Sequence, residues 1–219
     1  MAEAEVIDTP FGALVTIALA PSTAAERRAT THAGGRVALK HALEAVGATV
    51  TSPIDTDDRG APIVPQGFVG SIAHKELLAC ALAARDEGFR IGVDLEPVGA
   101  VGAHLEPRIL TPSEVATLSA FDEQTRGHAR TRRWVLKEAL YKALDPFVRR
   151  HVAFHEVEVV PHADGTATFT LQLAQGERGL VSEGRWLEHE GYAVAMVRVR
   201  PTSAPTSSRG ARPRRTSRA

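Results

Sequence analysis

The side chains best placed for chemistry stand in two short segments of the chain. Residues 92–97 alternate apolar and polar side chains as a β-strand does, so Asp94 and Glu96 should project from one face. Further along, a run of good helix formers places Glu138 and Lys142 four residues apart, one turn along a common helix face. Three carboxylates and an ammonium suit a hard divalent cation that carries a phosphate-rich ligand. Magnesium prefers oxygen ligands, and the phosphates of a substrate commonly complete its coordination shell.

Each of these two motifs also has a purely structural explanation. An Asp-x-Glu pair on a strand is most often a solvated face, and the Glu138–Lys142 spacing is most often a surface ion pair that contributes little. Taken singly, either motif is therefore weak evidence for a site. A third motif upstream makes the combination specific.

That third motif begins with Arg59 before Gly-Ala-Pro and continues through Gly70-Ser71 to His74. At this point the sequence resembles the 4′-phosphopantetheinyl transferases, in particular the group that activates enterobactin and surfactin synthetases. Members show a basic residue before Gly-x-Pro, then Gly-Ser-x-x-His, Gly-x-Asp-x-Glu and finally Trp/Phe-x-x-Lys-Glu-Ala-x-x-Lys. All four elements occur here in that order, and the resemblance covers about residues 24–157.

The resemblance implies an α+β fold of two pseudo-symmetric halves, each a long helix on a small, mainly antiparallel sheet. The active site would lie in the cleft between the halves. We expect an N-terminal half at residues 1–100 that carries the coenzyme A phosphate-binding residues with Asp94 and Glu96. A C-terminal half at 101–200 would carry the Glu138 helix, and residues 201–219 would form a disordered basic tail.

The implied reaction moves the 4′-phosphopantetheine arm of coenzyme A to a serine of an apo carrier protein and releases adenosine 3′,5′-bisphosphate. Mg²⁺ would be held by Asp94, Glu96 and Glu138. Glu138 is the favoured base, directly or through a metal-bound water, and Glu96 is the less favoured one. Lys142 would stabilise charge on the pyrophosphate, while Lys137 either assists or only flanks the site.

Four further residues match the family's coenzyme A contacts. Arg28 and Arg36 lie two turns apart on the first expected helix, Arg59 precedes the Gly-x-Pro, and His74 matches the histidine that contacts a phosphate of coenzyme A. The alternative for the two helix arginines is a solvated face, and for His74 a capping or core role. Asp94, Glu138 and Lys142 complete the expected coenzyme A site.

The sequence departs from the family at two positions beside these motifs. Val64 stands where an aromatic residue is common, and Lys75 stands where Cys or Ser is common. The acceptor stays open among nonribosomal peptide and siderophore synthetases, polyketide synthases and fatty-acid carriers, with secondary metabolism favoured. Two other function classes stay open as well: a different magnesium enzyme, such as a phosphohydrolase or nuclease, and a non-catalytic module that binds coenzyme A or a carrier protein.

Composition is that of an ordinary globular protein. The chain has 219 residues, is 43% hydrophobic and is formally neutral. Its single cysteine, Cys80, excludes an internal disulfide and sits among apolar residues, which indicates a buried, inert thiol. We expect a cytoplasmic, monomeric protein with no membrane span and no signal peptide. Residues 201–219 carry five arginines and no acid, without interleaved aromatics, so we do not predict nucleic-acid binding.

Local signals predict most of the elements that position these motifs. Thr23 and Glu26 have the spacing of a capping box, so a helix should begin there and run to Val46. A second helix should begin after Thr111, and the long helix with Glu138 should end before Pro146. Two hairpins are expected: strands 77–85 and 89–96 joined through 86–88, and strands 152–160 and 166–173 joined through Asp164-Gly165. Two further strands are expected at 12–20 and 192–199.

Overall fold

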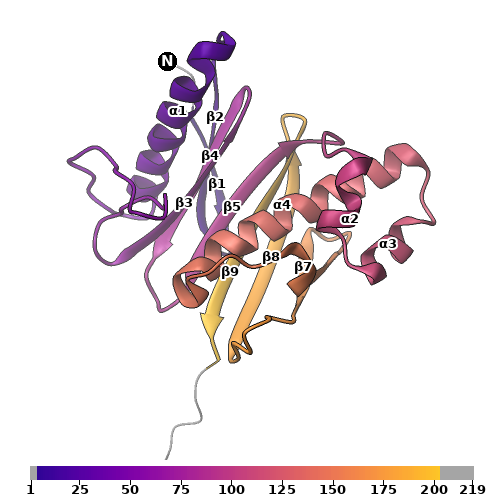
Figure 1. The fold of residues 1–219 in the computed structure, drawn as a ribbon. Coiled ribbons are helices and arrows are strands. Elements are labelled where there is room, and N and C mark those ends of the chain that lie inside the picture. Colours follow the sequence, from indigo (N-terminus) through magenta and orange to yellow (C-terminus); the bar gives the residue numbers. More distant parts are fainter. Residues whose placement is uncertain (1–3, 203–219) are drawn as a thin grey trace, which may run out of the picture.

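The computed structural model describes residues 4–202, which form two antiparallel sheets, each covered by one long helix (Figure 1). The predicted α+β fold of two similar halves is confirmed. The basic tail predicted for residues 201–219 lies almost wholly outside the described residues. Among the helices of residues 4–202, none has the length and apolar character needed to cross a membrane.

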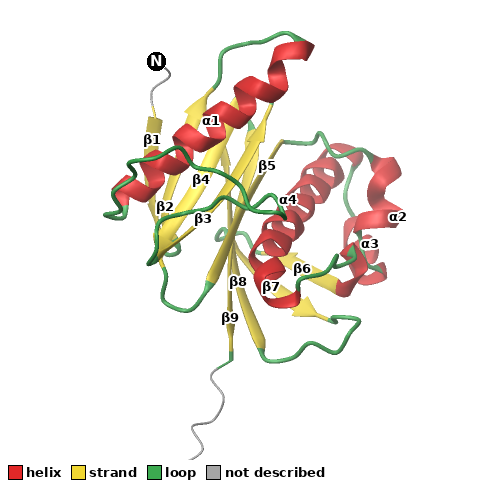
Figure 2. Cartoon of the chain, turned by 60° about the vertical axis from the view of Figure 1, so that its left-hand side comes forward, coloured by secondary structure: helices red, strands yellow, loops and turns green. Residues whose placement is uncertain are grey.

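The first sheet has the order β1-β2-β4-β3 and carries α1 on one face (Figure 2). The predicted capping box is present at the start of α1, where the Thr23 hydroxyl accepts from the Glu26 amide and the Glu26 carboxylate accepts from the Thr23 amide. The elements are β1 (Ala4–Thr9), β2 (Gly12–Ala18), α1 (Ala24–Ala45), β3 (Phe68–Lys75) and β4 (Leu78–Arg85).

The second sheet has the order β5-β9-β8-β7-β6, and α4 lies across it. Thr111 caps α3 with a second capping box, so this helix begins where predicted. Asp122 caps α4. The elements are β5 (Arg90–Pro97), η1 (Ala103–Leu105), α2 (Glu106–Ile109), α3 (Pro112–Leu118), α4 (Glu123–Val148), η2 (Phe154–Glu156), β6 (Val157–Pro161), β7 (Thr166–Leu171), β8 (Leu180–His189) and β9 (Tyr192–Pro201).

The strand that carries Asp94 and Glu96 belongs to the second sheet, which corrects the predicted hairpin. The expected hairpin through 86–88 is wrong, because β4 pairs with β2 and β3 whereas β5 pairs along its whole length with β9. The two acids were expected in the N-terminal half, yet they lie in the same sheet as the strands that follow α4. We therefore propose that the halves divide between Arg85 and Arg90 rather than at residue 100.

Four further differences concern element boundaries. Strands β1, β3 and β8 were not predicted, and α4 runs through Pro146 to Val148 instead of ending before it. Pro146 lies in the last turn of α4, where its missing N–H removes one backbone hydrogen bond without ending the helix. The turn at Asp164-Gly165 does join β6 to β7 as predicted, with Gly165 at a φ of 80°.

The two sheets pack against each other through the faces that their helices leave free. Leu14, Cys80 and Leu82 of the first sheet share one buried cluster with Val93 and Met196 of the second. Cys80 is fully buried, as predicted, and burial raises the pKa of its thiol well above the ordinary range. The edge strands β3 and β5 meet at this contact, so side chains from both halves converge there.

Candidate active site

The close approach of α4 to β5 brings the acidic and basic motifs together. Gly92 permits it, because a Cβ at this position would lie 1.9 Å from the carbonyl oxygen of Ala139 on α4. Gly92, Asp94 and Glu96 share one face of β5 by the two-residue period of a strand. The helix therefore rests on the face that carries both acids, one residue along α4 from Glu138.

Lys142 ties three elements together at this point. Its Nζ donates to Asp94 Oδ1 at 2.8 Å and to the carbonyl oxygens of Val93 on β5 at 2.8 Å and Ile72 on β3 at 3.2 Å. Its ion-pair partner is thus Asp94 across the interface, not Glu138 one turn away on its own helix. The alternative of a solvated Glu138–Lys142 surface pair does not describe this structure.

The carboxyl group of Glu138 has an unusual environment for an acid. Burial raises its pKa to about 7, and the negative charge of Asp94 adds to the shift. Lys142 opposes the shift and Glu96 reinforces it. Burial is the largest cause of the shift, and the repulsion from Asp94 and Glu96 is the part of it that a divalent cation would relieve.

The donor set suits magnesium in its chemistry, since all three side chains offer carboxylate oxygens. Within residues 4–202, however, no three Asp, Glu, His or Cys side chains stand close enough to hold a metal ion as they are. Asp94 is bonded to Lys142 and Glu96 Oε1 to Lys75 Nζ at 2.8 Å. The acids fit the cation, and binding it requires these carboxylates to exchange ammonium partners for metal.

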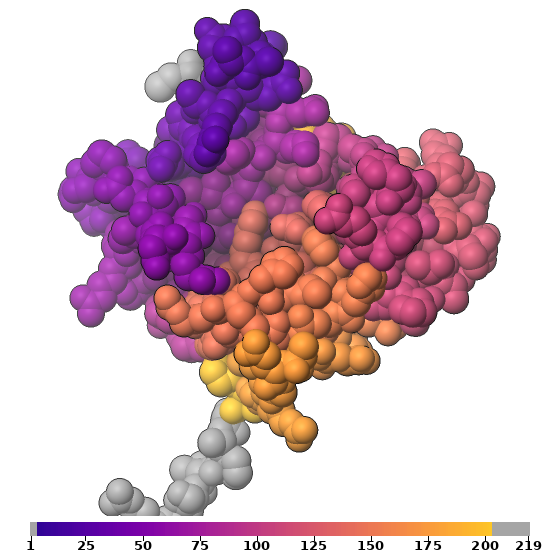
Figure 3. Space-filling model, viewed as in Figure 1, coloured from indigo at the N-terminus to yellow at the C-terminus, as the bar shows by residue number. Residues whose placement is uncertain are grey.

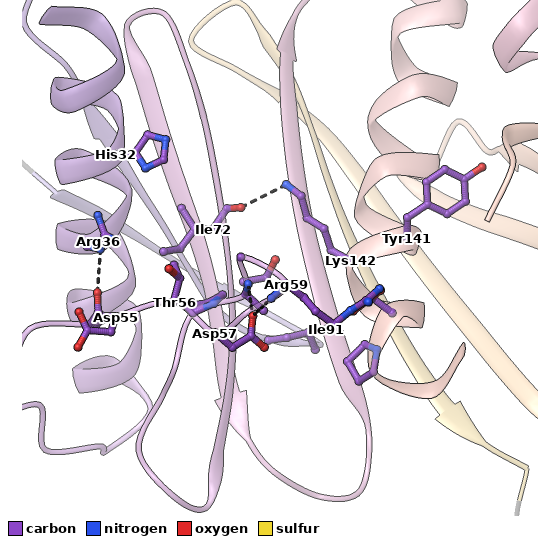
Figure 4. Close-up of a pocket in the computed structure, with 18 of the residues that line it drawn as sticks. His32, Arg36, Asp55, Thr56, Asp57, Arg59, Ile72, Ile91, Tyr141 and Lys142 are labelled. Atoms are coloured by element: carbon purple, nitrogen blue, oxygen red, sulfur yellow. Dashed lines mark hydrogen bonds and ion pairs between the residues drawn. The ribbon is translucent and has the colours of Figure 1, made fainter. Parts of the chain in front are cut away.

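A cleft of about 490 Å³ opens beside Lys142, between α1, β3, the loop after α1 and the end of α4 (Figure 4). His32 and Arg36 line it from α1, opposite Lys142 and Tyr141 from α4. The helix can sit this close to β3 because position 35 is glycine: a Cβ there would lie 2.6 Å from Ile72 Cγ2. Lys142 lines the cleft and also bonds Asp94, so it lies between the cleft and the acids.

His74 projects from β3 into the same cleft, and its ring centroid is 4.7 Å from that of His32. Burial lowers the pKa of His74, and the positive charges of His32 and Lys142 lower it further. A lowered pKa means that this ring loses its proton more readily than an ordinary histidine does.

The structure brings three of the four predicted coenzyme A contacts to this cleft. Arg36, Arg59 and His74 line it, whereas Arg28 is exposed on α1 outside the lining. The Nε of Arg36 donates to the carbonyl oxygen of Ile54 at 2.7 Å, which holds the loop after α1 against the helix. Arg59 forms a bidentate ion pair with Asp145, and this loop lies against the end of α4 in the space-filling view (Figure 3).

Comparison with known proteins gives this geometry its context. The chain matches the 4′-phosphopantetheinyl transferase superfamily over residues 90–197 and the 4′-phosphopantetheinyl transferase N-terminal domain over residues 16–84. It is 30% identical over 186 residues to the 4′-phosphopantetheinyl transferase Npt of Nocardia iowensis, covering 78% of this chain and 82% of that relative. The chain belongs to the 4′-phosphopantetheinyl transferase superfamily.

Two further similarities were found. Enterobactin synthase component D of Salmonella typhi is 33% identical over 123 residues, which cover 55% of this chain and 50% of that protein. The coenzyme A complex of an ACPS from Chronobacterium ammoniagenes superimposes with a TM-score of 0.43 and 22% identity, covering 52% and 98% of the two chains. The predicted activity, transfer of phosphopantetheine from coenzyme A to a carrier protein, is confirmed at the level of the enzyme class.

Several residues of the cleft and beside the acids were not among the predicted site residues. The sequence places His32 between Arg28 and Arg36, four residues from each on the same helix face, but we did not assign it a contact. Asp145 gave no signal, since nothing local links it to Arg59, 86 residues away in the chain. Lys75 was noted only as a departure from the family, without a contact.

Lys137, the neighbour of Glu138, proves to be a structural residue of the transferase. It is fully buried, and its Nζ donates to Glu114 Oε2 and the Ile109 carbonyl at 2.8 Å each and to the Phe154 carbonyl at 3.1 Å. Glu114 Oε1 in turn accepts from the amide of Val159 on β6 at 2.8 Å. Lys137 therefore fixes α4 against α3 and the second sheet rather than facing the cleft.

Removing this ammonium should destabilise the fold. In a Lys137→Met variant the Glu114 carboxylate stays buried without its cation, and breaking a buried pair costs about 3–5 kcal/mol. Urea unfolding followed by circular dichroism measures the loss, with Lys40→Met as control because Lys40 forms an exposed pair with Glu44 on α1. A change of less than about 1 kcal/mol at position 137 would contradict the structural role.

Proposed function

We propose that the enzyme catalyses magnesium-dependent transfer with the adenosine end of coenzyme A in the cleft and the pyrophosphate at Lys142. The observation that carries this is the position of Lys142, which lines the cleft and bonds one of three clustered acids. The cleft would hold the nucleotide at one end of the pyrophosphate, and the carboxylates would hold the metal beside the reacting phosphorus at the other end. Lys142 lies between these two places.

The basic groups of the cleft would bind the adenosine 3′-phosphate. Arg36 and Arg59 supply guanidinium groups, which bind phosphate oxygens in a planar, bidentate way, and His74 adds a proton-dependent contact. For Arg59 this requires the phosphate to compete with Asp145, its present partner. Arg28 would contribute only long-range charge, since it is exposed outside the lining.

The chemistry is a displacement at phosphorus. The serine hydroxyl of the carrier attacks the phosphorus next to the pantetheine, the bond from that phosphorus to the bridging oxygen breaks, and adenosine 3′,5′-bisphosphate leaves. Mg²⁺ bound by Asp94, Glu96 and Glu138 would neutralise the pyrophosphate. Glu138 is the proposed acceptor of the hydroxyl proton, with Glu96 as the less favoured base. Lys142 donates to the leaving oxygens.

Purified enzyme with coenzyme A, magnesium and a panel of apo carrier proteins tests the whole proposal. We expect the mass of the carrier to increase by that of the phosphopantetheine arm. No increase is expected when the metal is chelated before the reaction. The panel should hold carriers from nonribosomal peptide, siderophore, polyketide and fatty-acid synthases, and we propose the secondary-metabolism carriers as the preferred acceptors. Phosphate release from simple esters, without carrier modification, would favour a phosphohydrolase instead.

Two further parts of the proposal concern the state of the protein. A monomer is supported by the cleft, whose lining comes from both sheets and both long helices of one chain. A reducing, cytoplasmic location is supported by the single cysteine, which is buried and unpaired.

The 3′-phosphate assignment predicts a difference between two ligands. Arg36→Gln should weaken coenzyme A binding by about 10- to 100-fold, the effect of losing one charge-assisted contact, and should scarcely affect 3′-dephospho-coenzyme A. Isothermal titration calorimetry measures both ligands. Arg27→Gln is the matched control, since this neighbouring α1 arginine lies outside the main cleft. Equal weakening for the two ligands would place Arg36 away from the 3′-phosphate.

The lowered pKa of His74 predicts proton uptake on binding. The pKa of the free ring is lowered and a bound phosphate should raise it, so binding of coenzyme A should be accompanied by proton uptake at pH values between these two pKa values. Calorimetry in buffers of different ionisation enthalpy measures the uptake. It should disappear in His74→Gln and shrink for the dephospho ligand. Unchanged uptake in the variant would assign the proton to another group.

A further inference from the structure

Lys75 places a second ammonium at the carboxylate cluster. Its Nζ donates to Glu96 Oε1 at 2.8 Å, the Lys75 side chain is 43% exposed and that of Glu96 only 15%. The lysine is the last residue of β3, and the tight turn that follows has Glu76 in the left-handed region at a φ of 46°. The amide of Leu77 donates to the Tyr192 hydroxyl at 3.3 Å, which fixes this turn against the second sheet.

Tyr192 also explains why Lys75 lies opposite Glu96. On β9 it pairs with Pro97, the residue after Glu96 on β5. The same tyrosine thus holds the turn that carries Lys75 and lines up the end of the strand that carries Glu96. The contact is built by the packing of the two sheets.

The ammonium groups of Lys75 and Lys142 offset the negative charge of two of the three carboxylates proposed to bind the metal. Asp94 is paired with Lys142 and Glu96 with Lys75, so of the three acids only Glu138 is without an ion-pair partner among the described residues. The two lysines differ in how firmly they are held. Lys142 also donates to two backbone carbonyls, whereas Lys75 is bound to Glu96 through a long, half-exposed side chain that can swing into water.

We propose that Lys75 is an internal counter-cation for Glu96, which competes with a divalent metal and makes metal binding depend on the anionic substrate. This inference rests on the proposed function, in which Glu96 is a metal ligand. Without coenzyme A the metal must displace an ammonium from Glu96. When coenzyme A is bound, its pyrophosphate gives the displaced ammonium of Lys75 a new anionic partner. It also gives the metal further oxygen ligands. Coenzyme A and the metal therefore each bind more tightly when the other is present.

Metal titration without turnover tests this. Mg²⁺ is titrated by calorimetry, with Mn²⁺ and its electron paramagnetic resonance signal as a second probe, into wild type, Lys75→Gln, Lys75→Arg and Lys40→Gln. We expect Lys75→Gln to bind metal about three- to tenfold more tightly in the absence of coenzyme A, the effect of removing one nearby charge. Lys75→Arg, which keeps the charge, and Lys40→Gln, which removes a distant exposed one, should match wild type.

Coenzyme A without a carrier gives the second half of the test. It should increase the metal affinity of wild type more than that of Lys75→Gln, because the variant has already lost the competing ammonium. Equal metal affinities in wild type and Lys75→Gln would overturn the role of Lys75 and leave the proposed function standing. Absence of metal binding in all four proteins, with coenzyme A present, would overturn the metal assignment itself.

Discussion

Replacing Glu138 by Gln should reduce phosphopantetheine transfer by about 10²- to 10⁴-fold, the contribution typical of a positioned general base. The substitution keeps the volume of the side chain and its hydrogen-bonding capacity, but it removes the proposed base and one proposed ligand of the metal. Single-turnover transfer to an apo carrier, with coenzyme A and magnesium saturating, measures the chemical step. Lys142→Arg keeps the positive charge but changes its shape, so it should be impaired yet measurable.

The stability of Glu138→Gln supplies its own control. In the metal-free protein burial raises the pKa of Glu138 from 4.5 to about 7, so the folded state binds the proton more tightly than the unfolded state. Ionising this carboxyl therefore opposes folding increasingly as the pH rises from about 4.5 to 7. The variant should match wild type in acid and unfold at higher denaturant at pH 8. Loss of transfer from a protein that is more stable cannot be ascribed to misfolding. Transfer at the wild-type rate would move the base to Glu96 or to solvent.

Local sequence signals predicted the parts of this fold that local physics decides. The capping boxes at Thr23 and Thr111 and the turn at Asp164-Gly165 each satisfy backbone groups within a few residues, and all three are present. The helical spacing of Glu138 and Lys142 was likewise readable. What it could not show is that Lys142 turns to Asp94 instead of Glu138, because that depends on how closely α4 rests on Gly92.

The strand that pairs with β5 could not be predicted from local sequence signals either, because this pairing also depends on contacts distant in sequence. A turn sequence at 86–88 predicts a hairpin, but strand pairing also depends on which edge is available, and β9 begins almost 100 residues later. β3 was missed because small and polar residues such as Ser71 and His74 give it a weak β signal. Its burial becomes clear only in the fold, where Ser71 Oγ accepts from the Val93 amide at 3.1 Å.

Replacing Asp94 by Asn should abolish measurable transfer, with a rate loss of at least about a hundredfold. A metal ligand at a developing phosphoryl charge is worth several kcal/mol of transition-state stabilisation. Asn keeps the size and one acceptor oxygen but removes the charge, so a tenfold excess of magnesium should not restore the rate. Asp86→Asn is the matched control, because Asp86 forms an exposed pair with Arg90 away from the cleft.

The proposed function gives Asp94 two separable roles, and metal titration tells them apart. As a metal ligand it sets the affinity for the cation, and as the partner of Lys142 it holds the ammonium between the cleft and the acids. The metal role predicts that Asp94→Asn loses both transfer and metal affinity, while Lys142→Gln loses transfer but keeps the metal. If Asp94→Asn bound Mg²⁺ with wild-type affinity and still failed to transfer, Asp94 would act only by positioning Lys142. The cation would then be held by Glu96 and Glu138 alone.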